Sequence, residues 1–236
     1  MILNMRNFTS ILTLFGLLTI APVSAYAQTN SAQTKPAGND LYDPVSRVVT
    51  ANLMSNFSDG KFHPQKMISR SELATIMVKT FRLDKQKAAL QENAIVVADV
   101  STNHQAFDDI QTVLKTGVMR GYRGNLFFPN QKVTRAEALA IFAQAYGIFQ
   151  FSEETVNQIL LDYQDQKSIP VWSRKAIATV ATEGFIEPDP DGNLSPLLPM
   201  SRGDMAMVLS KYLQRRQEQP NTPLVPAPAG SPVTPR

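Results

Sequence analysis

The chain contains no cysteine among its 236 residues. This absence excludes disulfide bonds, thiolate metal sites and cysteine nucleophiles, although it does not identify the compartment in which the protein works. Histidine is nearly as scarce, because His63 and His104 are the only two in the chain. Neither histidine has an evident catalytic partner in the sequence, so little supports imidazole acid–base chemistry.

Sequence signatures of common catalytic and cofactor sites are also absent. The chain has no P-loop, no dinucleotide-binding glycine fingerprint, no His-Glu-x-x-His zinc pair and no nucleophile elbow. The loop from Pro188 to Asn193 faintly resembles a calcium loop, but it lacks the alternating ligands and the downstream bidentate glutamate. We therefore expect a non-catalytic protein with no cofactor and no metal site. A glycosidase, which needs only two carboxylates in a cleft, stays open as an enzyme alternative.

Charge of one sign is not concentrated anywhere in the chain. The formal net charge is +3, and no basic stripe with interleaved aromatic residues is present. Nucleic-acid binding is therefore not expected. Apolar residues make up 43% of the chain, which suits an ordinary globular core.

Both ends of the chain differ in composition from its middle. Residues 1–27 read as a signal peptide, with Arg6, an apolar segment from Ile11 to Ile20 and an Ala25-Tyr26-Ala27 cleavage site. That apolar segment is about half the roughly 20 residues of a spanning helix, so we expect cleavage and no membrane span afterwards, with an uncleaved anchor as the alternative. Residues 28–40 predict a flexible linker, and residues 216–236 a disordered proline-rich tail.

One short stretch recurs three times, at residues 64–72, 129–137 and 196–204. Shifts of 65 and then 67 residues bring the copies into register, and the match continues on both sides of the stretch. Self-similarity of this kind predicts a repeat architecture. We place a repeat module at residues 41–215, with repeats at about 41–83, 97–148 and 163–215.

Each repeat predicts a helix, a turn and a second helix, so the fold class is mainly α. The first helix begins at Asp43-Pro44 in repeat one, and each first helix ends at a residue that tolerates a left-handed cap, namely Asn52, Gly117 and Gly184. Each second helix begins with a capping-box pattern. The boxes pair Ser69 with Glu72, Thr134 with Glu137 and Ser201 with Asp204. Residues 84–93 and 152–161 predict bridging helices.

The capping box does not explain the arginine that follows each cap, Arg70, Arg135 or Arg202. A cation in the first turn opposes the helix dipole by a few tenths to about 1 kcal/mol. Two interpretations stay open: a salt bridge to the neighbouring repeat, or an anionic ligand held by the guanidinium group. Free amides at the helix start are expected to add donors to such a ligand.

Three motifs of the chain resemble S-layer homology repeats. They are the Thr-Arg-Ala-Glu signature at 134–137, the Gly-Val-Met-Arg-Gly-Tyr run at 117–122 and the Phe-x-Pro motif at 127–129. The resemblance implies three repeats packed around a pseudo-threefold axis, with grooves between them. It also implies anchoring, in the cell envelope, to peptidoglycan or to a linked acidic polymer. The expected location is therefore an exported, wall-associated one, in the periplasm or the cell envelope.

The resemblance also implies the residues that would line the grooves. These are Arg70, Arg135, Arg202, Glu72, Glu137, Asp204, Trp172, Asp99 and Asp165. For Trp172, the only tryptophan, core packing and a stacking platform for a sugar ring both stay open. The alternative function is a structural or protein-interaction module of the envelope, with an envelope protein as its partner. The sequence leaves open which polymer is bound, how many grooves bind it and the oligomeric state.

Overall fold

Helices account for nearly all the regular structure in the computed structural model, which describes residues 43–90 and 93–219, all within the unit Asn39–Arg236. Among these residues the extended pairings are isolated bridges. The mainly-α prediction is therefore confirmed. The α-helices are α1 (Pro44–Thr50), α2 (Arg70–Phe81), α3 (Phe107–Lys115), α4 (Arg135–Tyr146), α5 (Glu153–Leu160), α6 (Arg174–Thr182) and α7 (Arg202–Glu218). The 3-10 helices are η2 (Leu83–Lys85), η3 (Gln166–Ser168) and η4 (Val171–Ser173).

The predicted helix boundaries hold because their caps form. Asp43 accepts from the amides of Val45 and Ser46 at the start of α1. Ser69, Thr134 and Ser201 each cap a second helix through the side-chain oxygen. The three expected left-handed positions, Asn52, Gly117 and Gly184, have φ of 56°, 73° and 73°.

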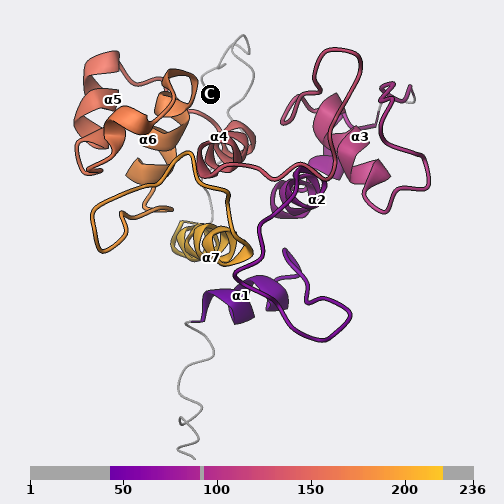
Figure 1. The fold of residues 1–236 in the computed structure, drawn as a ribbon, viewed down its shortest axis with the longest axis horizontal. Coiled ribbons are helices and arrows are strands. Elements are labelled where there is room, and N and C mark those ends of the chain that lie inside the picture. The colour runs from indigo at the N-terminus through magenta and orange to yellow at the C-terminus, as the bar shows by residue number, and fades with distance from the viewer. Residues whose placement is uncertain (1–42, 91–92, 220–236) are drawn as a thin grey trace, which may run out of the picture. The chain divides into compact units, whose positions relative to one another are not determined.

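The helices of each repeat pack onto those of its neighbours. The first helix of a repeat lies against the second helix of the preceding repeat, so α3 packs on α2, α6 on α4, and α1 on α7. Figure 1 shows α2, α4 and α7 end on near the middle, with the first helices outside them. The last pairing joins the first repeat to the third, which closes the set.

Three equivalent residues, one from each repeat, are also joined by backbone hydrogen bonds that form a closed ring. The amide of Ile68 donates to the carbonyl of Met200 at 3.0 Å, that of Met200 to Val133 at 2.9 Å, and that of Val133 to Ile68 at 3.3 Å. All three side chains are buried. This ring of hydrogen bonds is consistent with the expected pseudo-threefold arrangement.

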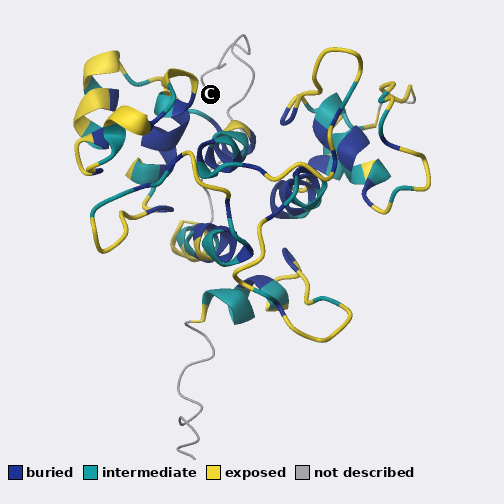
Figure 2. Ribbon diagram, viewed as in Figure 1, coloured by how far each residue is buried: buried dark blue, intermediate teal, exposed yellow. Residues whose placement is uncertain are grey.

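An aromatic cluster fills the space among the second helices. Phe81 of α2, Phe142 of α4 and Tyr212 of α7 meet with ring centroids 5.2 to 5.7 Å apart. Phe185 packs edge-on against Phe142 and Tyr212, and Tyr146 packs edge-on against Tyr212 and stacks on Phe142. Figure 2 shows many of the buried residues on these helices and many of the exposed ones on the outer loops and on α5. The core of the module is therefore shared by all three repeats.

The prediction of a bridging helix over residues 84–93 is wrong for the described residues. The chain forms only the 3-10 turn η2, Leu83–Lys85, followed by further turns. Arg82 ends α2 in a left-handed conformation, and Leu83 is then fully buried, so the chain turns back at once. The polar residues that follow give a longer helix no apolar face to pack with. The other bridging helix is confirmed as α5, capped by Ser152.

Three of the predicted segments fall largely outside the described residues. These are the signal peptide at 1–27, the linker at 28–40 and the tail, of which residues 220–236 lie outside. The helix α7 runs to Glu218, three residues beyond the predicted end of the module. No described helix is long and apolar enough to span a membrane.

Candidate ligand-binding groove

The arginine that follows each helix cap, here called a signature arginine, is hydrogen-bonded to the neighbouring repeat. The Nε of Arg70 donates to the carbonyl of Phe127 at 2.7 Å, that of Arg135 to Leu194 at 2.7 Å, and that of Arg202 to Phe62 at 2.9 Å. The three acceptors occupy equivalent loop positions, one in each repeat. A cation in the first turn of each helix is therefore explained partly by an inter-repeat hydrogen bond. Such bonds to a charged donor each stabilise a protein by about 1.5–3 kcal/mol.

The amides at the start of each second helix are already used. The first two of each helix donate to carbonyls in the loop of a neighbouring repeat, as from Arg70 to Gln131 and from Ser71 to Pro129, both at 2.9 Å. The third amide donates to the Ser or Thr cap. The expectation that these amides would add donors to a ligand is therefore wrong, because the repeats use them to hold each other together.

The three signature acids differ in what they contact. Glu72 forms an ion pair with Arg202, while its own helix lacks the second half of the capping box. Asp204 completes the box at Ser201 and also lies 2.9 Å from Arg135. Burial raises the pKa of Asp204. The hydrogen bond from Ser201 and the positive charge of Arg135 lower it by a larger amount, so the pKa of Asp204 falls below its ordinary value. The salt-bridge interpretation thus describes two of the three arginines.

Glu137 is the exception among these acids. It completes the capping box at Thr134 through hydrogen bonds of 2.8 and 3.2 Å. No ion pair joins it to Arg70 among the residues that the structure describes, although its charge raises the pKa of that arginine. Burial is the larger effect and lowers the pKa of Arg70 overall. Arg70 is thus a buried cation whose Nη2 donates to the carbonyl of Arg120 at 2.8 Å, and no carboxylate in the described part of the chain forms an ion pair with it.

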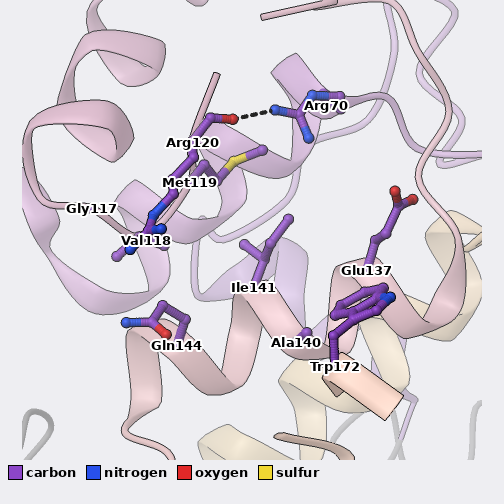
Figure 3. Close-up of a pocket in the computed structure, with 10 residues that line it drawn as sticks. All are labelled: Arg70, Gly117, Val118, Met119, Arg120, Glu137, Ala140, Ile141, Gln144 and Trp172. Atoms are coloured by element: carbon purple, nitrogen blue, oxygen red, sulfur yellow. Dashed lines mark hydrogen bonds between the residues drawn. The ribbon is translucent and has the colours of Figure 1, made fainter. Parts of the chain in front are cut away.

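A groove of about 260 Å³ opens beside Arg70. Its floor is α4, one wall is the loop after α3, and the other wall is Trp172 from η4 (Figure 3). The lining residues are Arg70, Gly117, Val118, Met119, Arg120, Glu137, Ala140, Ile141, Gln144 and Trp172. Three of the expected ligand-binding residues, Arg70, Glu137 and Trp172, are therefore brought together here, and we call this space the Arg70 groove.

Trp172 is 64% exposed, so it is not a core residue. In Figure 3 it lies beside the α4 residues Ala140 and Glu137, at the edge of the groove. Of the two interpretations left open by the sequence, the exposure agrees with the stacking platform. The ring extends the apolar lining formed by Val118, Met119 and Ile141, and an exposed apolar surface rimmed by polar residues is typical of ligand-binding grooves.

In the other two inter-repeat spaces, side chains at equivalent positions contact each other, although one of these spaces still contains a cavity of about 410 Å³ lined by Asn52, Lys79 and Asp109. Where the Arg70 groove has Ala140, the others have Thr75 and Met207. Thr75 donates to Asp109 of the next repeat at 2.5 Å, which bridges that space. In the third inter-repeat space, Lys211 is the residue equivalent to Gln144, and it forms an ion pair with Glu187 at 2.6 Å. Pairing among the protein's own residues thus occupies groups that a ligand would need.

Asp99 and Asp165 lie on loops rather than in the Arg70 groove. The carboxylate of Asp99 accepts from the amides of Phe127 and Phe128 at 2.8 and 2.6 Å. Asp165 does the same for Leu194 and Ser195, at 2.9 and 2.7 Å. Each carboxylate fixes the loop whose carbonyl receives a signature arginine.

Sequence reasoning missed several residues of the Arg70 groove. Met119, Arg120 and Gln144 line it. Met119 and Arg120 lie in the 117–122 motif, but the resemblance did not identify them as ligand contacts, and nothing in the local sequence marks Gln144. The repeat register gives one usable signal, because Gln144 aligns with Lys79 and Lys211, so that position faces an inter-repeat space each time. Among the described residues no cluster of acids and histidines is arranged to hold a metal ion.

Three interlocked helical repeats, with an arginine and an exposed tryptophan at one groove, define a repeat-built helical module. Residues 38–74, 98–139 and 162–206 match the S-layer homology domain. Because these matches cover more than half of its 236 residues, the chain belongs to the S-layer homology domain family.

Relatives with this similarity include surface-layer and anchoring proteins as well as enzymes. The chain is 27% identical over 204 residues to the Surface-layer 125 kDa protein of Lysinibacillus sphaericus, an alignment that covers 85% of this chain and 16% of the relative. It is 27% identical over 138 residues to the Cellulosome-anchoring protein of Acetivibrio thermocellus, covering 57% and 28%. The Amylopullulanase of Thermoanaerobacterium thermosulfurigenes is 22% identical over 174 residues, covering 73% and 9%. The chain therefore spans less than a third of each of these relatives.

Proposed function

We propose that this protein is a non-catalytic anchoring module that binds peptidoglycan or an acidic polymer linked to it. The observation that carries the proposal is the Arg70 groove, where a buried guanidinium group that forms no ion pair with any described carboxylate lies near an exposed tryptophan. An acidic sugar matches both groups, because its carboxylate accepts from arginine and its ring stacks on the indole. The surface-layer and cellulosome-anchoring relatives support a location at the cell wall.

The proposed roles within the site follow from the contacts. Arg70 holds the anionic group, Trp172 supports the ring, and Glu137 and Gln144 bond hydroxyl groups. Arg135, Arg202, Glu72 and Asp204 join the repeats, and Asp99 and Asp165 position the loops. We assign the Arg70 groove as the principal binding groove because a signature arginine and an exposed tryptophan both line it. The protein acts after export, in the periplasm or the cell envelope.

Co-sedimentation with cell-wall sacculi stripped of protein tests this proposal. The purified protein is mixed with sacculi before and after mild acid treatment, which removes attached polymers. Binding that disappears after acid identifies an acidic accessory polymer as the ligand, whereas binding that persists identifies peptidoglycan. Absence of binding in both cases contradicts the proposal and favours the second candidate, an envelope protein-interaction module. Release of soluble sugars would contradict the non-catalytic assignment.

A further inference from the structure

An aromatic ring from the adjacent loop covers two of the three signature arginines. The Cζ of Arg70 lies 4.8 Å from the ring centroid of Tyr122, and the Cζ of Arg202 lies 4.6 Å from that of Phe57. Each covering ring is backed by a second one, Phe128 at 5.2 Å and His63 at 5.4 Å. Tyr122 and Phe57 occupy equivalent positions in their repeats, as do Phe128 and His63.

Among the described residues, no aromatic ring covers the third arginine, Arg135, in this way. In the third repeat the two equivalent positions hold Asp189 and Ser195. The side chain of Arg135 is 19% exposed, against 5% for Arg202. Both substituted residues line a cavity of about 600 Å³ beside Arg135. The cavity lies where the other repeats place their aromatic pair, so we call it the ring socket.

The ring socket has apolar walls and an acidic rim. Leu198, Pro199 and Met67 line it, with Leu198 60% exposed and Met67 37% exposed. Asp189 and Asp191 are exposed at the turn beside it. Arg135 is neutralised by Asp204, so the charge of the rim is negative. An aromatic ring with basic neighbours would complement this surface, because the ring packs against the apolar walls and the guanidinium face while the basic groups pair with the acidic rim.

The second repeat presents such a ring on the same chain. Phe128 is 41% exposed and Tyr122 is 42% exposed. Arg120, Arg123 and Lys132 are exposed on the same turns. The nearby acid Asp99 is turned inward onto backbone amides. We call this surface, Tyr122 and Phe128 with the three cations, the basic knob.

We propose that the protein associates head to tail with a second copy of itself, the basic knob of one molecule entering the ring socket of the next. Phe128 packs between Leu198 and Met67 toward the guanidinium group of Arg135, and Arg123 faces Asp189 and Asp191. The two surfaces differ, so the contact is heterologous, and each molecule keeps one free knob or socket for a further copy. The proposal does not rest on wall binding.

Two single substitutions test the two surfaces one at a time. Phe128→Ser removes the aromatic ring of the basic knob and introduces the residue type that the third repeat has at the equivalent position, Ser195. Asp189→Tyr covers Arg135 with the ring type that Tyr122 provides. Ser195→Phe is a second way to fill the socket, and it adds no new backbone strain because Ser195 and Phe128 both have φ of 56°. Leu161→Ser is the matched control, because Leu161 is an apolar residue that is 65% exposed and belongs to neither the basic knob nor the ring socket.

Sedimentation velocity over a range of protein concentrations is the measurement. We expect the wild type and Leu161→Ser to grow in mass with concentration, more strongly at low salt. Each knob or socket variant alone should associate at least about tenfold more weakly, as for a buried aromatic anchor. A mixture of Phe128→Ser with Asp189→Tyr should form a 1:1 dimer, because one intact knob and one intact socket remain.

Three results would overturn the proposal. They are a wild type that stays monomeric at every concentration, association that survives both kinds of variant, and loss of association that mixing does not restore. Thermal unfolding of each variant shows whether it is folded. If Asp189→Tyr is unfolded, Ser195→Phe takes its place in the mixture.

Discussion

Arg202 of the third repeat forms an ion pair with Glu72 of the first, 130 residues earlier in the chain. The same guanidinium group donates to the carbonyls of Phe62 and Ser55, at 2.9 and 2.6 Å. Its side chain is 5% exposed. One buried cation therefore makes three contacts that join the last repeat to the first.

Replacing this arginine should cost more stability than any surface charge. Arg202→Gln removes the ion pair and the inter-repeat bonds and leaves Glu72 and two carbonyls unpaired. We expect a loss of about 3–5 kcal/mol in the free energy of unfolding, measured by urea denaturation. Lys175→Gln is the control, because its pair with Glu153 at 3.4 Å is exposed and should be worth about 1 kcal/mol or less. Equal losses of unfolding free energy in the two variants would contradict the conclusion that Arg202 holds the first and third repeats together.

Asp99 should act on the Arg70 groove through the loop that it holds. In Asp99→Asn one carboxylate oxygen that accepts from a loop amide becomes a donor, which costs about 1–3 kcal/mol. Because the carbonyl of Phe127 receives Arg70, loosening this loop should also weaken wall binding. Amide hydrogen exchange at Phe127 and Phe128 is expected to rise at least about tenfold, and co-sedimentation measures the binding.

Asp165→Asn is the matched control for that experiment. It loosens the equivalent loop at Leu194 and Ser195, which lies outside the Arg70 groove. We expect faster exchange there with wall binding unchanged. If Asp99→Asn abolished binding while its loop amides kept their protection, Asp99 would instead contact the ligand directly.

Tyr163 should make stability depend on alkaline pH. Burial, with smaller contributions from Asp162 and Glu187, raises its pKa from 10.0 to about 12. The folded state therefore holds this proton more tightly than the unfolded state. Its contribution is complete below pH 10 and disappears as the pH rises through 12.

The variant Tyr163→Phe should lose that part of the pH dependence. A difference of two pKa units corresponds to about 2–3 kcal/mol, so the wild type should fall by up to that amount more than the variant. Urea unfolding across this pH range measures it. Tyr122→Phe, at a ring 42% exposed, controls for removal of a phenol. Parallel pH profiles for the wild type and Tyr163→Phe would show that Tyr163 does not contribute.

The helices and their caps were predictable because their causes are local. Ser201 and Asp204 are three residues apart, and both halves of their capping box form. Gly117 and Gly184 take the left-handed conformation that their position requires. Repetition strengthened each inference, since one pattern was read in three places.

The partners of the signature residues were not predictable, because they depend on how the repeats interlock. Glu72 has the same sequence context as Glu137, yet it turns away from its cap to Arg202. Which repeat supplies each carbonyl follows from tertiary packing alone. The exposure of Trp172 is of the same kind, because local sequence does not distinguish a buried tryptophan from one at a groove edge.

Binding of Trp172→Ala to protein-free sacculi tests the central claim most directly. The residue is 64% exposed, so the substitution should change stability by no more than about 0.5 kcal/mol. Leu161→Ala, at a residue 65% exposed and away from the Arg70 groove, is the control. We predict that co-sedimentation of Trp172→Ala weakens about tenfold or more while Leu161→Ala binds as the wild type does. Undiminished binding of a folded Trp172→Ala protein would contradict the assignment of the Arg70 groove as the wall-binding site.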